Sequence, residues 1–412
     1  MNLTKTPARP VPEPTGLLNK SALLLPVLAA LILLAPYLEA QTPGETILQS
    51  YERIFIRSNL STKVNILLDA ANDEAADEFY GPFCELALRF VIINAPLFPD
   101  DPDMINITIG AIKGVAKYSY TPAADTLWQA FLRFPDNVIR VEILRTLALL
   151  NAPVLTERIN QFLADQNRLY GTGPGADMRI FPALIEVLGK IGNDASYPIL
   201  FAASFIYPGD LGENALRAIH QIKGDLFSFC LGVILKNPPA EKLEALKLAA
   251  VRNDFTDVQK GVLAEAALET ALASVSAERR NQNSALCELS VRLIKETERV
   301  TALPLVIKYY QQCLASFRLD PSQIQPLLDT VSCLAVLKST NAAQLLSLQL
   351  GIYNSRVNAI SAEEQKFVLA LISALGKLGY KASYDSVYQA SVLPYPAEIN
   401  TAALDALNRL QW

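Results

Sequence analysis

Apolar and small residues recur along this chain in one spacing, with successive steps of three, one, three and three residues. The clearest copy consists of Phe181, Leu184, Ile185, Leu188 and Ile191. Two further clear copies run from Ile324 to Leu334 and from Val368 to Leu378. This spacing places the residues on one face of a helix with 3.6 residues per turn. The pattern therefore predicts a series of amphipathic helices, each with one buried face.

Four looser copies extend the series. They run from Thr108 to Tyr118, from Arg140 to Leu150, from Gly212 to Ile222 and from Asn400 to Leu410. The fourth positions of successive copies are 32, 41 and 31 residues apart, then 112, then 44 and 32. Such intervals are typical of helical-repeat proteins, and the longest leaves room for three more units. The sequence predicts an all-α array, and an array of this kind favours an interaction surface over a catalytic pocket.

A second pair of apolar residues follows 12 and 15 positions after the fourth residue of a copy. These pairs are Leu127 and Ala130, Ile159 and Phe162, Leu200 and Ala203, Leu231 and Ile234, and Val387 and Ala390. Two helices per unit follow from this. Gly192 and Gly379 stand in the turns between them, where glycine suits a helix C-cap. No stretch sustains the alternation of a β-strand.

Two segments resemble a known repeat family. Residues 183–195 (ALIEVLGKIGNDA) and 372–379 (ISALGKLG) are similar to HEAT repeats, whose first helix ends in an Ala-Leu-Gly-x-Ile-Gly-Asp/Asn pattern. Tetratricopeptide repeats are the competing family, but their Trp and Leu-Gly signature and regular 34-residue period are absent. The HEAT resemblance implies a right-handed α-solenoid, here of about eight helix pairs, whose second helices line a concave surface and bind proteins.

The amino-terminal segment has the pattern of an export signal. Lys5, Arg9 and Lys20 precede the uncharged run from Ala22 to Pro36, which is about 15 residues long and short of the roughly 20 that a spanning helix needs. We expect cleavage after Ala40. An uncleaved membrane anchor formed by residues 22–38 and a cytoplasmic protein with a misleading leader remain the alternatives.

The expected organisation therefore has three parts. Residues 1–40 form the signal peptide or anchor, residues 41–60 a lead-in helix, and residues 61–412 the HEAT-like solenoid. The last copy, from Asn400 to Leu410, lacks a second helix and is expected to cap the array as a half-unit. We expect the destination to be the periplasm or the cell envelope of a bacterium, or the membrane if residues 22–38 remain as an anchor.

Composition supports one long array and excludes some partners. Of 412 residues, 51% are hydrophobic and 19% are charged, and no flexible linker divides the chain. The net charge is -5 without a basic block, so nucleic acid is not an expected partner, because phosphate binding needs clustered Lys and Arg. We expect protein partners, and contact with a membrane only through an uncleaved amino-terminal segment.

Candidate chemistry is sparse. Five scattered cysteines, Cys84, Cys230, Cys287, Cys313 and Cys333, fit buried apolar positions rather than a disulfide framework or a metal site. His220 is the single histidine, which excludes multi-histidine metal sites. The glycine-rich run 171–175 lacks the context of a phosphate loop, and the acidic turn 98–103 fits a helix cap better than a calcium site. No metal, cofactor or catalytic residue is predicted.

Aromatic residues on the second helices are the candidate partner contacts. They are Trp128, Phe131, Tyr197, Phe201, Phe205, Tyr309, Tyr310, Tyr384 and Tyr388. Tyrosine and tryptophan dominate binding hot spots, although aromatic residues at helical spacing also form cores. Tyr170 and Arg179 flank the glycine-rich loop and are added as loop contacts.

These observations predict an exported protein-binding scaffold without catalysis or cofactor. An enzyme or enzyme subunit on the same fold is the alternative, for which a HEAT-like lyase is a precedent by resemblance. A membrane-tethered assembly factor that keeps its leader is the third interpretation.

Overall fold

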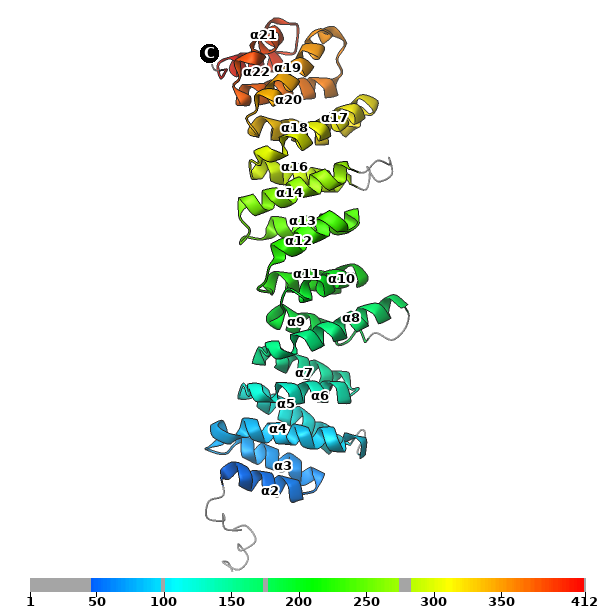
Figure 1. Ribbon diagram of the computed structural model, residues 1–412, viewed down its shortest axis with the longest axis vertical. Coiled ribbons are helices and arrows are strands. Elements are labelled where there is room, and N and C mark those ends of the chain that lie inside the picture. Colours follow the sequence, from blue (N-terminus) through cyan, green and yellow to red (C-terminus); the bar gives the residue numbers. More distant parts are fainter. Residues whose placement is uncertain (1–45, 98–100, 173–176, 274–282, 411–412) are drawn as a thin grey trace, which may run out of the picture. The chain divides into compact units, whose positions relative to one another are not determined.

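The computed structural model describes residues 46–97, 101–172, 177–273 and 283–410 (Figure 1). All regular elements among these residues are α-helices or short 3-10 helices, which confirms the all-α prediction. The predicted signal segment lies outside the described residues. The chain divides into two compact units, residues 1–134 and 135–412, which are described separately.

The first unit contains a lead-in helix and two helix pairs. Its helices are α2 (Ile47–Arg57), α3 (Leu60–Ala71), α4 (Ala76–Asn94), α5 (Pro102–Lys117) and α6 (Ala124–Arg133). Thr46 and Gln49 form a capping box that begins α2, and Asp101 caps α5 by accepting from the backbone of Asp103 and Met104. Helix α3 packs on α5, while α4 packs on α2 and α6, so first and second helices form separate layers.

The second unit continues with seven pairs and a final single helix. Its helices are α7 (Asn137–Leu150), α8 (Thr156–Thr172), α9 (Phe181–Ile191), α10 (Ser196–Ile206), α11 (Asp210–Gln221), α12 (Leu226–Lys236), α13 (Pro239–Val251), α14 (Asp257–Leu272), α16 (Ser284–Glu296), α17 (Leu303–Leu319), α18 (Ile324–Val336), α19 (Thr340–Asn354), α20 (Ala362–Leu378), α21 (Tyr384–Val392) and α22 (Ala397–Leu407). Figure 1 shows the helices of this unit stacked across its length, from green to red.

Helices of the second unit contact their neighbours in the stack by layer. In the layer of first helices, α9 packs between α7 and α11, and α20 packs between α18 and α22. In the layer of second helices, α8 packs on α10, α12 on α14, and α19 on α21. Pairs stacked in two layers form a HEAT-like α-solenoid. The described residues contain nine pairs, close to the eight expected.

The predicted stripes form the core where the pattern is strict. All five stripe residues of α9 and all five of α20 are buried. Gly192 and Gly379 end these two helices as predicted. Gly379 adopts a left-handed conformation (φ 72°), which favours glycine. A side chain at Gly192 would lie 2.3 Å from the Leu188 carbonyl oxygen, so only glycine fits there.

The last stripe is buried only in part. Ala403 and Leu410 are buried as the pattern predicts, but Leu404 is 54% exposed. Helix α22 also buries Ile399 and Ala406, which lie outside the stripe. The buried face of α22 is therefore centred on Ala403 and turned away from Leu404.

No helix among the described residues is long and apolar enough to cross a membrane.

Candidate functional site

Four second helices of the second unit are almost free of charge. Helices α10 and α19 contain no charged residue, α12 contains only Lys236, and α21 contains only Asp385. Several first helices carry more charge: α9 carries Glu186 and Lys190, and α16 and α20 carry four charged residues each, although α18 carries only Asp329. We call α10, α12, α19 and α21 the neutral helices. The neutral helices also differ from α8 and α14 in their own layer, which carry four charged residues each.

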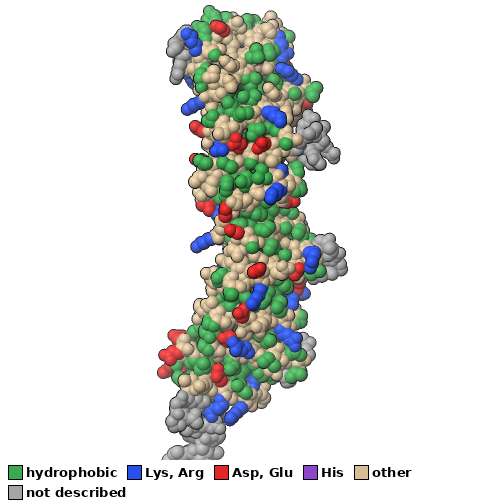
Figure 2. Space-filling model, viewed as in Figure 1, with side chains coloured by type: hydrophobic (Ala, Val, Ile, Leu, Met, Phe, Trp, Pro, Cys, Tyr) green, Lys and Arg blue, Asp and Glu red, His purple; other side chains and the backbone are tan. Residues whose placement is uncertain are grey.

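The neutral helices also expose large apolar side chains. These are Phe205 on α10, Leu235 on α12, Leu348 and Ile352 on α19, and Tyr388 and Val392 on α21. An isolated exposed apolar residue is ordinary, but here the exposure recurs on helices that also lack charge. Figure 2 shows basic and acidic side chains scattered among apolar ones, without a large basic patch on the visible face.

The direction of the helices brings several of these side chains to one edge. Consecutive helices joined by short turns run antiparallel, so all second helices of the unit run the same way. Phe205, Leu235 and Val392 lie in the last turns of their helices. The last turn of α17 carries Leu319, which is 89% exposed. The last turns of α10, α12, α17 and α21 therefore each expose a large apolar side chain, beside Lys236 in α12 and Arg318 in α17.

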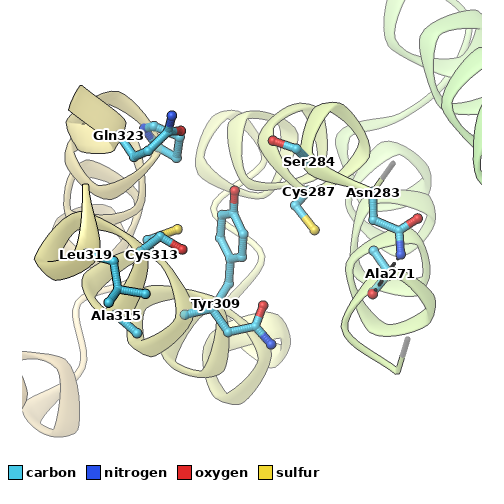
Figure 3. Close-up of a pocket in the computed structure, with 12 residues that line it drawn as sticks. Ala271, Asn283, Ser284, Cys287, Tyr309, Cys313, Ala315, Leu319 and Gln323 are labelled. Atoms are coloured by element: carbon cyan, nitrogen blue, oxygen red, sulfur yellow. Dashed lines mark hydrogen bonds between the residues drawn. The ribbon is translucent and has the colours of Figure 1, made fainter. Parts of the chain in front are cut away.

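A cavity of about 290 Å³ lies beside α17 (Figure 3). Figure 3 shows the Tyr309 ring between Cys313 and Cys287, with Gln323 and Ser284 above it. The remaining lining comes from Ala271, Asn283, Gln312, Ala315, Ser316, Leu319 and Pro326. None of the twelve side chains is charged, so the cavity suits an uncharged group.

The thiols in this cavity are poor nucleophiles. Burial raises the pKa of Cys287 to about 12 and that of Cys313 to about 11. Burial, and then the neighbouring Cys313, raises the pKa of the Tyr309 hydroxyl. Because only a thiolate attacks efficiently, the arrangement provides polar contacts for a ligand rather than covalent chemistry.

Four of the seven candidate contact residues are buried, and the expectation that they present a surface needs correction. Trp128 stacks on Phe131 with ring centroids 4.8 Å apart, and Tyr197 stacks on Phe229 at 5.6 Å. Tyr310 is also in the core, and Tyr309 reaches only the cavity. A large ring at a helical core position gains more from burial than from exposure, and sequence spacing does not distinguish the two faces.

The other three candidates are accessible. Tyr170 and Arg179 are exposed, and Tyr384 is half-buried and stacked on exposed Tyr388 with ring centroids 5.9 Å apart. Tyr170 lies 4.7 Å from the Tyr207 ring. The structure does not bring Tyr384 together with the other two, and their contact with a partner stays a prediction.

The exposed aliphatic residues Leu235, Leu348, Ile352 and Val392 were not predicted as contacts, because an aliphatic side chain in an apolar helix is expected in the core. The available signal was the absence of charge from whole helices, which can be counted in the sequence once the helices are known.

The remaining sequence candidates fill structural positions. All five cysteines are free and buried, as predicted. His220 is partly buried at the end of α11, where Arg252 donates to its carbonyl oxygen at 2.8 Å. Part of the glycine-rich run lies outside the described residues. No group of three potential metal ligands occurs in the part of the chain that the structure describes.

Comparisons with known proteins find distant structural likeness to solved helical structures. No family model and no curated protein matches the chain. A crystal structure of importin beta is 12% identical, with a TM-score of 0.33 over 88% of this chain and 55% of that chain. An engineered protein is 13% identical, with a TM-score of 0.32 over 89% of this chain and 99% of that chain. This chain thus spans about half of the importin beta chain. The fold of this chain is established by the packing of its own helices.

Proposed function

We propose that the protein is a protein-binding scaffold whose partners contact the neutral helices. The observation that carries this proposal is the combination of missing charge and exposed apolar side chains on α10, α12, α19 and α21. Interface cores are depleted of charged residues and enriched in aromatic and large apolar ones. The partner surface is accordingly apolar and carries little charge.

The proposal includes export to a bacterial envelope, which rests on the charged and then apolar amino-terminal sequence. A protein cleaved after Ala40 begins at Gln41, whereas a membrane-tethered assembly factor keeps residues 1–40. The mass of the amino-terminal peptide, measured on protein from the envelope fraction, separates these forms.

Site-specific crosslinking tests the binding face. A photo-reactive amino acid replaces exposed Phe205 or Leu348 on neutral helices, and exposed Glu186 or Lys377 on first helices serves as the control. After illumination of intact cells, we expect both neutral-helix positions to capture one defined protein that the control positions do not. Equal capture at all four positions, or capture only at the controls, would contradict the assignment of the face.

The alternative of an enzyme finds no specific support in the described residues, since burial keeps the Cys287 and Cys313 thiols of the cavity beside Tyr309 protonated. It predicts a small molecule that co-purifies with the isolated protein and is released on denaturation.

A further inference from the structure

We propose that a second cavity, between α17, α19 and α20, binds a carboxylate that carries an apolar body. Its volume is about 450 Å³, within the range of roughly 300 to 1,000 Å³ for small-molecule sites. It is lined by Phe317, Arg318, Pro321, Gln349, Ile352, Tyr353, Arg356, Ser361 and Glu364. All nine belong to the second unit, and the cavity is separate from the one beside Tyr309.

The charges of this cavity are unbalanced. Arg356 is hydrogen-bonded to Glu364 and lies 4.6 Å from the Tyr353 ring centroid. The other carboxylate oxygen of Glu364 accepts from the Ser361 amide at 2.8 Å. Glu364 is therefore engaged through both oxygens, and its charge offsets that of Arg356.

Arg318 gives the cavity a net positive charge. This residue is exposed, lines the cavity next to Phe317 and forms no ion pair with any described residue. Two arginines against one glutamate give a net charge of +1. Guanidinium groups bind carboxylates through paired, charge-assisted hydrogen bonds, so Arg318 selects an anion.

The amide of Gln349 supplies a second binding group. Gln349 is 6% exposed and lines the cavity. Its amide atoms are not among the fully buried polar atoms that lack a partner, so they remain accessible from the cavity. The Gln349 amide can therefore donate to a carboxylate oxygen of a bound ligand in place of water.

Apolar lining residues would contact the rest of the ligand. Phe317, Tyr353 and Pro321 provide apolar surface, and Ile352 is 42% exposed. A ligand with a ring or a branched chain next to its carboxylate matches this mixed lining. Such a group is found in a free small acid and at the carboxyl terminus of a protein chain. The inference does not depend on the scaffold proposal.

Titration calorimetry on the full chain tests the site with phenylacetate and its uncharged analogue phenylacetamide. We expect phenylacetate to bind and phenylacetamide to bind at least about tenfold more weakly, because only the carboxylate pairs with Arg318. R318Q should weaken phenylacetate binding about tenfold, and Q349L should weaken it as well. R217Q on α11 removes the same charge elsewhere and should leave the affinity unchanged.

A second pair of probes separates the two sources of the carboxylate. N-acetyl-Ala-Phe with a free carboxyl terminus should bind more tightly than phenylacetate if the natural ligand is a chain terminus, and less tightly if it is a free acid. Equal affinities for phenylacetate and phenylacetamide, or unchanged binding to R318Q, would overturn the proposal. So would failure of both phenylacetate and the peptide acid to bind at about 10 mM to protein that circular dichroism shows to be folded.

Discussion

Two buried asparagines play the same structural part at different places in the second unit. Asn167 on α8 donates to the Ile199 carbonyl of α10 at 3.1 Å, and Asn354 on α19 donates to the Ser386 carbonyl of α21 at 2.8 Å. In both cases the two residues are 32 positions apart. Each asparagine joins a second helix to the next one in the stack, so a side-chain hydrogen bond fixes the spacing that apolar packing alone leaves adjustable.

Replacing Asn354 with alanine should lower the free energy of unfolding by about 1 to 3 kcal/mol. The amide donates to Ser386 and accepts from the Tyr395 hydroxyl at 3.1 Å, and both buried partners would lose their bond. Urea unfolding measures the effect. The exposed Asn341 lies on the same helix, and its replacement with alanine should change stability by less than about 0.5 kcal/mol. Equal effects of the two replacements would contradict this role.

His220 should make stability depend on pH in the acidic range. Burial, followed by the charge of Arg252, lowers the pKa of His220 below its usual 6.5, against the opposing effect of Asp254. A lowered pKa in the folded state means that the neutral imidazole stabilises the fold above pH 6.5. This stability is lost as the pH falls through the lowered pKa.

Thermal unfolding between pH 7.5 and pH 5 measures this dependence, and H220Q should flatten it. An unchanged slope in H220Q would show that other groups are responsible.

At the scale of elements, the sequence predicted the helices and their pairing well. All stripe residues of α9 and α20 are buried. Rotating either helix to bury another face would expose several large apolar residues at once. In the looser stripe at Asn400–Leu410, Ala403 and Leu410 are buried but Leu404 is exposed, since Ile399 and Ala406 complete the buried face of α22 beside Ala403. Periodicity identifies a helix, but packing decides which face is buried when the faces differ little.

The aspartate variant of Leu188 tests the assigned register. Leu188 is fully buried in α9, and a charge there has no partner. We expect L188D to lose more than about 3 kcal/mol of unfolding free energy, measured by urea unfolding. The exposed residue Glu186 on the same helix is the control, and E186A should change the free energy of unfolding little. Equal melting of L188D and the unchanged protein would contradict the register.

At the scale of the whole molecule, each helix of the second unit depends on its neighbours in the stack. Stability in such an array is a sum of units and of contacts between adjacent units. Damage at one end should therefore stay local. The cavities could not have been predicted from sequence, because their walls combine residues from helices such as α14 and α18 or α17 and α20, which the chain brings together only by stacking.

Replacing Leu371 of α20 with aspartate should raise hydrogen exchange in α18 to α22 while α7 to α10 stay protected. Leu371 is fully buried, and α20 packs on α18 and α22 but makes no substantial contact with α7 to α10. Hydrogen exchange read by mass spectrometry locates the change. Uniform loss of protection from α7 to α22 would instead show that the second unit unfolds as one cooperative body.

The missing charge on the neutral helices has a consequence for how a complex would respond to salt. Ions screen attraction between charged groups over about 10 Å at 0.1 M ionic strength, but they leave apolar contacts intact, and sulfate strengthens them. A partner held by Phe205, Leu235, Leu348 and Val392 should therefore stay bound through washes that strip proteins held by opposite charge. The same wash should release a carboxylate ligand from Arg318, so one change of buffer would distinguish the two surfaces of this protein.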